Sequence, residues 1–237
     1  MDSLRFGDTV VSVLYCDDDF LAVNKPAGVP VFTSRGRVAG TLSEVVLKNG
    51  ISLYEGDETE LPGVVHRLDK DTSGVMILAR SQAGWNDFHR QIAARETRKE
   101  YLALVSGAFV ETRGRIDVPI GSTHSQGLLL RAADSAGRPS ATEFEVVRCF
   151  GSRASLLRIR IETGRTHQIR VHFSYIGHPV LGDYTYGYRR QRGLVIERQM
   201  LHAFALSFHV PGSGKQVRVL APLPPDFISV LGVLAAS

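Results

Sequence analysis

The sequence is short of cysteine and of long apolar runs. Its two cysteines, Cys16 and Cys149, lie far apart and show neither metal-ligand spacing nor a disulfide framework. Residues 1–6 lack the apolar core of a signal peptide. The longest apolar run near the end, 227–236, is about ten residues, which is too short to span a bilayer. We therefore expect a cytoplasmic protein that does not cross a membrane.

Several signatures of catalysis are also missing. There is no phosphate-binding loop, no zinc-ligand spacing and no HExxH pattern. A hydrolase triad could be drawn from Ser73, His167 and Asp69, but the GxSxG elbow that mounts such a serine is absent. Scattered metal ligands could be drawn from Asp183, His202 and His178. Nothing fixes their spacing, so we expect neither a metal site nor a cofactor.

The charge balance is basic and comes mainly from arginine. The chain carries 28 Lys and Arg against 24 Asp and Glu, for a net charge of +4. Only five of the 28 are lysines, which leaves 28 − 5 = 23 arginines. Arginine binds phosphate through two parallel hydrogen bonds and stacks on bases, so this bias suits an RNA partner. A base-composition bias in the genome would also enrich arginine, so the bias is supporting evidence only.

Length and pattern favour one folded domain over residues 1–237. Hydrophobic content of 43% and charged content of 22% are ordinary for a globular protein with a substantial core. We see no internal repeat and no low-complexity linker. Many strands and few helices predict an α+β fold with a mixed, mostly antiparallel sheet. We expect strands at 10–15, 20–24, 75–79, 100–106, 115–120, 142–147, 155–162, 201–208 and 216–220.

The predicted helices are marked by their caps and apolar stripes. Thr41 is expected to cap a helix over 41–49, and Ser81 a helix that runs to about residue 95. A third helix is predicted to begin at Thr166 and to stop at Gly177, with Arg170 pointing away from its apolar face. A last helix is expected over 224–234. Residues 33–40 and 121–139 are interpreted as loops.

Two clusters of polar residues suggest a catalytic function. The first, HRLDKDTSG at 66–74, stands directly before the apolar strand 75–79. A strand fixes the position of a neighbouring loop, and the loop supplies reach, so catalytic groups are often mounted this way. The second cluster, TGRTHQIRVH, occupies 163–172. Taken alone, the first cluster could also be a charged surface turn that leads into a core strand.

The two clusters resemble motifs of the RluA family of RNA pseudouridine synthases. The first is similar to that family's signature, and the second, continued by IGHPVLGD at 176–183, to its later motif. VNKPAG at 23–28 and KEYLALVSG at 99–107 agree with two further motifs, in the family's order. The resemblance implies the α+β catalytic domain of that family. Because the 23–28 motif starts so early, we expect no amino-terminal S4-type RNA-binding domain.

The resemblance also implies a reaction and its catalytic residues. These enzymes detach the uracil of a uridine in RNA at N1, turn it and rejoin it through C5, without metal or cofactor. Asp69 matches the carboxylate that serves as nucleophile or as base, with Asp71 as the competing candidate. Arg170 matches the arginine that pairs with this carboxylate. Tyr101 matches the tyrosine that packs against the target base, although it could also be an ordinary core aromatic.

Further residues are expected to bind RNA. By resemblance, Arg67 enters the space that the target nucleotide leaves when it flips out of the RNA. His66 and Lys25 are expected either to contact RNA or to brace the loop. Arg165 and His167 are predicted RNA contacts of the second cluster. The expected partner is a stem-loop of ribosomal or transfer RNA, the expected state a monomer, and the alternative function an RNA-binding module that has lost activity.

Overall fold

The computed structural model describes residues 3–31, 40–56, 61–125, 128–187 and 193–236. It divides the chain into two compact units. Unit 1 comprises Met1–Arg98 and Ala203–Leu223, and unit 2 comprises Lys99–His202 and Pro224–Ser237. Among the described residues, no helix is both long and apolar enough to cross a membrane.

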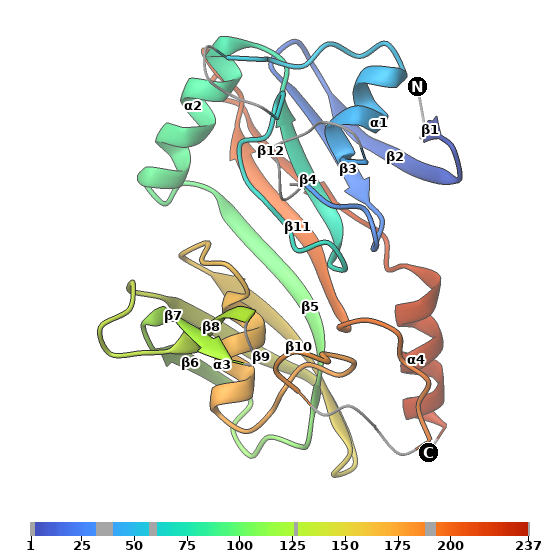
Figure 1. The fold of residues 1–237 in the computed structure, drawn as a ribbon, viewed down its shortest axis with the longest axis vertical. Helices are drawn as coiled ribbons and strands as arrows, with labels where there is room; N and C mark the ends of the chain where they lie inside the picture. The colour runs from blue at the N-terminus through green and yellow to red at the C-terminus, as the bar shows by residue number, and fades with distance from the viewer. Residues whose placement is uncertain (1–2, 32–39, 57–60, 126–127, 188–192, 237) are drawn as a thin grey trace. The chain divides into compact units, whose positions relative to one another are not determined.

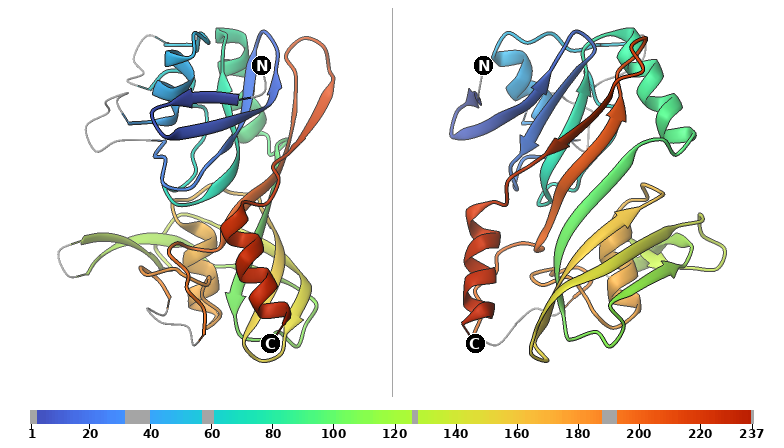
Figure 2. Two further views of the ribbon diagram at one scale, coloured as in Figure 1. Left: turned by 90° about the vertical axis from the view of Figure 1, so that its right-hand side faces the viewer. Right: turned by 180° about the vertical axis from the view of Figure 1, so that it is seen from behind.

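Unit 1 contains a mostly antiparallel set of strands and two helices (Figure 1). The strand order is β1-β2-β3-β4-β11, with β12 paired to β11. Figure 2 shows β11 and β12 as a long hairpin. The strands are β1 (Ser3–Phe6), β2 (Thr9–Cys16), β3 (Phe20–Lys25), β4 (Ser73–Ala79), β11 (Leu201–His209) and β12 (Gln216–Leu220), and the helices are α1 (Leu42–Lys48) and α2 (Gln82–Ala93).

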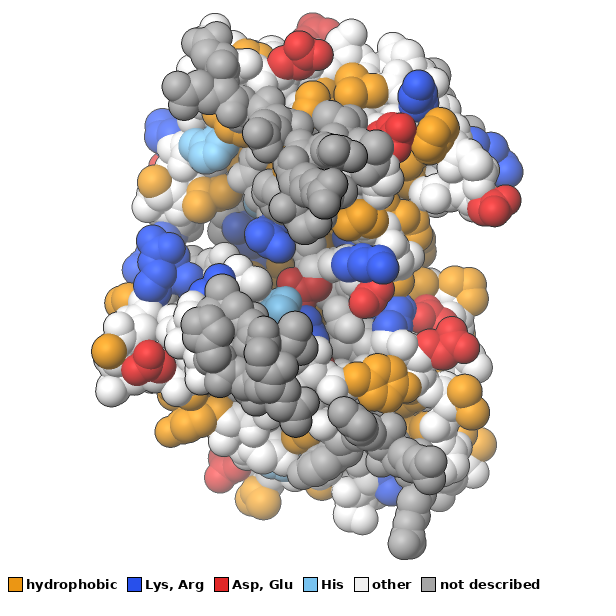
Figure 3. Space-filling view, in the orientation of Figure 1, with side chains coloured by type: hydrophobic (Ala, Val, Ile, Leu, Met, Phe, Trp, Pro, Cys, Tyr) orange, Lys and Arg blue, Asp and Glu red, His pale blue; other side chains and the backbone are white. Residues whose placement is uncertain are grey.

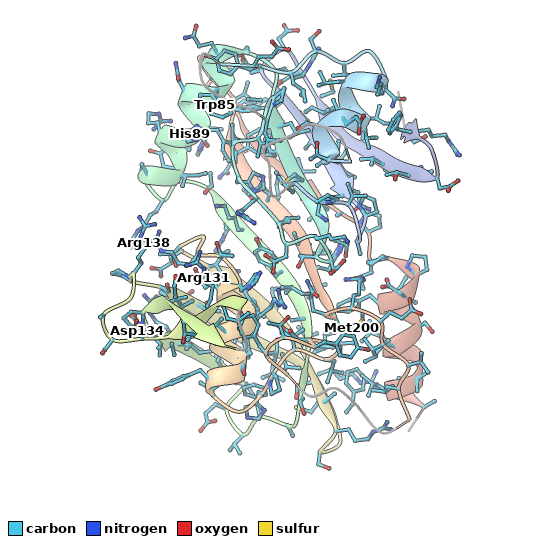
Figure 4. The ribbon with its side chains drawn as sticks, viewed as in Figure 1. Trp85, His89, Arg131, Asp134, Arg138 and Met200 are labelled. Atoms are coloured by element: carbon cyan, nitrogen blue, oxygen red, sulfur yellow. The ribbon has the colours of Figure 1, made fainter. Side chains whose placement is uncertain are left out.

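The core of unit 1 is built around aromatic side chains. Phe20 of β3 and Phe208 of β11 meet edge to face at 5.1 Å between ring centroids, and both contact Phe88 of α2. Such edge contacts place the positive rim of one ring against the negative face of another. Trp85 and Ile92 pack against this cluster, which confirms the predicted stripe on α2. His89 lies one turn from Trp85 on the same helix (Figure 4), at 4.7 Å between ring centroids.

The helix caps of unit 1 are those that the sequence predicts. Thr41 Oγ1 accepts a hydrogen bond from the backbone N–H of Glu44, and Ser81 Oγ accepts one from Gly84. Each bond satisfies a donor that the first helical turn would otherwise leave unpaired. Both helices therefore start where an oxygen-bearing side chain is available at the N-cap.

Gly74 is fixed by a close backbone approach, and replacing it with alanine is expected to be strongly destabilising. Its φ is +116°, and an added Cβ would lie 2.2 Å from the carbonyl oxygen of Ala203. We expect Gly74→Ala to lower the free energy of unfolding by about 3 kcal/mol or more, because strain and overpacking add. Denaturant unfolding measures the loss. Gly151→Ala is the matched control, since its φ is also positive but nothing lies within 4 Å of the added Cβ. Equal losses in the two variants would contradict the steric argument.

Unit 2 contains four antiparallel strands and a separate two-stranded ribbon. Its strand order is β5-β10-β9-β6, and β7 pairs with β8. The strands are β5 (Arg98–Ser106), β6 (Arg113–Asp117), β7 (Ile120–Ser125), β8 (Leu128–Ala133), β9 (Ala141–Phe150) and β10 (Ala154–Ile161), and the helices are α3 (Gln168–Tyr175) and α4 (Pro225–Ala235). Phe144 of β9 and Phe173 of α3 meet at 5.5 Å between ring centroids. The predicted α+β fold with a mostly antiparallel sheet is confirmed.

Two sequence predictions for unit 2 are wrong. The strand expected at 115–120 ends at Asp117, and a new strand begins at Ile120, because Pro119 between them has no N–H for the ladder. The long loop expected at 121–139 contains most of the β7–β8 ribbon. Ile120 and Arg138 close its base through two backbone hydrogen bonds of 2.9 and 3.0 Å. Neither IGSTHS in β7 nor LLLRAA in β8 alternates between apolar and polar residues, so the pattern did not reveal the strands.

The start of α3 also differs from the prediction. The helix begins at Gln168 rather than at Thr166, because His167 has a φ of +59° in the left-handed region. A helix cannot pass through that conformation. The predicted stop is confirmed, since Gly177 has a φ of +81° directly after the helix.

Candidate active site

The loop at 66–74 is held by its backbone and by one buried side chain. Thr72 N–H donates to the Asp69 carbonyl at 3.1 Å, and Gly28 N–H donates to the Lys70 carbonyl at 3.0 Å. The Leu68 side chain is buried, whereas Arg67 is exposed and Asp69 partly exposed. The loop therefore fixes its own shape and leaves Arg67 and Asp69 accessible.

Lys25 ties the 23–28 motif to this loop. Its side chain is 0% exposed. Its Nζ donates to the carbonyl oxygens of Pro26 at 3.0 Å, Val29 at 2.8 Å and Lys70 at 2.8 Å. An ammonium has three donors, so this arrangement uses all of them. These bonds hold the 23–28 motif against the loop, and an RNA contact by Lys25 stays a prediction.

His66 is placed against the core of unit 1. Its Nε2 accepts a hydrogen bond from the Ile77 backbone N–H at 2.9 Å, so the ring proton of the neutral form is on Nδ1. The ring stacks on Phe88 at 5.6 Å between centroids. His66 thus joins the loop to β4 and α2, which also corresponds to the bracing alternative.

In unit 2, Gln168 organises the turn at 163–167. Its Oε1 accepts from the Thr163 hydroxyl at 2.8 Å and from the Arg165 backbone N–H at 3.1 Å. Its Nε2 donates to the Ala141 carbonyl at 2.9 Å and to Thr142 Oγ1 at 3.0 Å. A single buried amide therefore fixes the turn to β9. The sequence did not single out Gln168 beyond its place in the motif.

A chain of hydrogen bonds continues from Thr142 through His172. The Thr142 hydroxyl, which accepts from Gln168, lies 2.9 Å from His172 Nδ1, and His172 Nε2 lies 2.9 Å from the Val118 carbonyl. This pattern requires a proton on Nε2 and none on Nδ1. Burial lowers the pKa of His172 and so keeps the ring neutral. These bonds fix the His172 side of α3 against β9.

Arg170 forms a buried ion pair with Asp183. Its Nε and Nη2 donate to the two carboxylate oxygens at 2.7 and 2.9 Å. The Arg170 side chain is 8% exposed and that of Asp183 0%. Asp183 Oδ1 also accepts the backbone N–H groups of Thr185 and Tyr186, each at 3.0 Å. Arg170 is buried although it lies one position beyond Ile169 of the apolar stripe, because the Asp183 carboxylate pairs with its charge.

The pairing expected for Arg170 from the resemblance is with Asp69, which belongs to unit 1. That pairing stays a prediction. Asp183 was considered from the sequence only as a scattered metal ligand. Its position in the motif at 176–183 was visible, but its partner depends on how α3 packs against the following turn. Within the described part of the chain, no group of His, Cys, Asp or Glu could hold a metal ion.

His167 and Arg165 connect the turn to the ribbon region. His167 Nδ1 lies 2.8 Å from the Tyr186 hydroxyl, which accepts the Arg131 backbone N–H at 3.1 Å. Arg165 Nε donates to the Pro139 carbonyl at 3.2 Å. Arg131 and Arg138 lie in and beside the ribbon (Figure 4), and blue Lys and Arg side chains gather near it in Figure 3. The RNA contacts predicted for Arg165 and His167 stay predictions.

Tyr101 lies in β5, opposite Ile159 of β10. Its side chain is 8% exposed, so both a core role and a contact through its edge fit its position. Tyr186 was missed by the sequence analysis. Its ring lies 5.0 Å from the Arg170 guanidinium, and its hydroxyl joins His167 to the ribbon. No local pattern marked it, because its contacts with Arg170, His167 and Arg131 come from other parts of the chain.

Comparisons with known proteins agree with these motifs. A family model described as RNA pseudouridylate synthase matches residues 19–175. The chain is 44% identical over 208 residues to an uncharacterized RNA pseudouridine synthase of Chloroflexus aurantiacus, covering 88% of this chain and 64% of that protein. It is 36% identical over 242 residues to ribosomal large subunit pseudouridine synthase D of Vibrio parahaemolyticus, covering 96% and 71%.

A solved structure has the same fold. The human RNA pseudouridylate synthase domain containing 1 aligns with a TM-score of 0.73 and 30% identity, over 96% of this chain and 95% of that one. The fold and the motifs are those of RNA pseudouridylate synthases. The chain belongs to the RNA pseudouridylate synthase family, and the predicted RluA-type membership is confirmed. It spans just under two thirds of the length of the Chloroflexus relative.

Proposed function

We propose that this protein isomerises specific uridines in structured ribosomal or transfer RNA to pseudouridine. The observation that carries the proposal is the family match over residues 19–175, which includes Asp69 on a loop that is anchored by backbone bonds. Asp69 acts as nucleophile or base once the target nucleotide has flipped out. Tyr101 packs against the base, and Arg170 keeps the carboxylate charged and directed.

The proposed function bears on the domain organisation, the oligomeric state and the location of the protein. The assigned roles fall on both units, so we propose that residues 1–237 work as one catalytic domain. We further propose a monomer that acts in the cytoplasm, where ribosomal and transfer RNA are found. The isomerisation is redox-neutral, and its steps need only proton transfer and nucleophilic attack, so no cofactor is assigned.

Mapping pseudouridine after incubation tests the function. The purified protein is incubated with total RNA that lacks its modification, in excess EDTA, and new pseudouridines are located by sequencing. We expect modification at a small set of uridines, and none with Asp69→Asn. RNA binding without any new pseudouridine would contradict the proposal and favour the inactive RNA-binding module. Loss of turnover in EDTA, restored by one metal with the RNA still folded, would refute a metal-free reaction.

Arg67 provides a test of base flipping. If Arg67 fills the space left by the target nucleotide, its loss is expected to matter most where flipping is hardest. Flipping a stacked base costs roughly a few kcal/mol, and an unstructured RNA avoids part of that cost. We therefore expect Arg67→Ala to lower the single-turnover rate more on a stem-loop than on an unstructured RNA with the same target. Arg67 is exposed, so the fold is expected to tolerate the change.

The matched comparison for this prediction is Arg170→Ala. Arg170 is assigned to a step after flipping, so its loss is expected to lower the rate on both RNAs to a similar extent. Equal losses for Arg67→Ala on the two RNAs would leave Arg67 as an ordinary phosphate contact.

A further inference from the structure

Lys99 lies on the face of the unit 2 sheet that α3 covers. It pairs with Ile161 of β10, which in turn pairs with Thr142 of β9. Directly paired residues on neighbouring strands point to the same face of a sheet. Thr142 contacts Gln168 and His172 of α3, so Lys99 shares the face on which that helix packs.

The ammonium of Lys99 lies beside the turn at 163–167. A Cβ added to Gly164 would stand 3.9 Å from Lys99 Nζ. Gly164 therefore brings bare backbone close to the amine, at the point where the chain enters α3. Lys99 is only partly buried by its accessible surface, so a ligand can reach it.

Lys99 has no partner of its own among the described residues. None of their hydrogen bonds or ion pairs involves its Nζ. Burial lowers the pKa of Lys99 to about 8, and no nearby charge offsets that effect. Lys25 shows the opposite arrangement, because all three of its donors meet carbonyl oxygens. A bound anion would stabilise the charged form of Lys99, which burial disfavours.

The surroundings of Lys99 favour an anion. The turn carries Arg165 and His167, and it carries no acidic residue. Glu162, which precedes the turn, is engaged by the guanidinium of Arg115. Glu100 follows Lys99 on the strand and therefore points to the opposite face. An ammonium beside other basic groups binds phosphate as a compact point charge.

We propose that Lys99, at the turn 163–167, binds a phosphate group of the RNA backbone. This inference rests on the proposed function for the identity of the ligand. It adds a positioning contact that holds the RNA strand next to the N-terminus of α3. Because Lys99 and Tyr101 are two residues apart on one strand and share a face, the bound phosphate would set the register of the RNA relative to Tyr101.

Replacing Lys99 separates binding from stability. We expect Lys99→Met to raise the melting temperature, because it removes an unpaired, partly buried ammonium. The same change is expected to weaken RNA binding by about tenfold and to reduce the slope of log affinity against log salt by about one. A merely structural lysine would not change the salt slope.

The experiment measures binding of a synthetic uridine-containing stem-loop RNA across a range of NaCl concentrations. The variants are Lys99→Met, Lys99→Arg and Lys215→Met, in which Lys215 is an exposed lysine of unit 1. We expect Lys99→Arg to restore the wild-type slope and Lys215→Met to leave it unchanged. An unchanged slope and affinity in Lys99→Met would overturn the inference.

A second measurement uses the wild-type protein alone. The NMR signals of the Lys99 side chain are followed through a pH titration with and without inorganic phosphate. Phosphate bound at Lys99 is expected to raise its pKa, whereas no change would count against the site. If Lys99→Met keeps the salt slope but loses the basic limb of the pH–rate profile, Lys99 is a proton-transfer group and the phosphate site is refuted.

The phosphate site and the isomerase function are contradicted by different results. An intact salt-slope effect in a protein without turnover would refute the isomerase function and leave the phosphate site in place. Turnover by the wild-type protein, with no effect of Lys99→Met on RNA binding, would refute the phosphate site and leave the isomerase function in place.

Discussion

Asp69→Asn is expected to lower single-turnover isomerisation on the order of a thousandfold or more. The amide keeps the shape of the side chain, but it neither attacks carbon nor accepts a proton at neutral pH. The bond that closes the turn uses the Asp69 carbonyl and not its side chain, so the loop is expected to keep its shape. RNA affinity should therefore stay within a few-fold of wild type.

The matched control is Asp71→Asn, two residues away in the same loop. We expect this variant to keep most of its activity, since the resemblance assigns the catalytic carboxylate to Asp69. Rates are measured under single-turnover conditions, and affinity by filter binding. An Asp69→Asn protein that retains more than about a tenth of the wild-type rate would count against Asp69 and turn attention to Asp71.

Arg170→Met is expected to damage both stability and turnover. Removing the guanidinium leaves the Asp183 carboxylate, which is 0% exposed, without its charged partner. Breaking a buried pair from one side costs about 3–5 kcal/mol, because an uncompensated charge remains inside. The free energy of unfolding measures this loss, and the single-turnover rate is measured under conditions in which the variant is folded.

A double variant separates the two effects. In Arg170→Met with Asp183→Asn, both charges of this pair are removed, while the amide oxygen still accepts the N–H groups of Thr185 and Tyr186. We expect this protein to recover much of the lost stability and to remain inactive. Recovery of turnover together with stability would show that Arg170 serves the fold alone.

The structural predictions that were confirmed rest on local features of the sequence. Thr41 and Ser81 begin helices because their own oxygens satisfy nearby N–H groups. The stripe of α2 and the strands that were predicted follow from periodicity, which each segment carries by itself. The family motifs were visible for the same reason, since they are short runs of residues.

Predictions failed where no apolar period marks the element. The β7–β8 ribbon was taken for a loop because β7 is rich in Gly, Ser and Thr, and neither strand alternates between apolar and polar residues. Its pairing is fixed by backbone bonds between Ile120 and Arg138 and by the Tyr186 hydroxyl, which lies far away in the chain. A single segment does not encode such contacts.

The sequence by itself determined the fold class, the family and the residues to which catalysis is assigned. It left open what each polar residue does, because burial and partners arise only when distant segments meet. Lys25 and Lys99 show the difference, since both stand in motifs and both are lysines. Tertiary structure surrounds Lys25 with carbonyl oxygens from two segments and leaves the Lys99 amine without a partner among the described residues. The free energy of a charged group depends on these neighbours, and the fold alone supplies them.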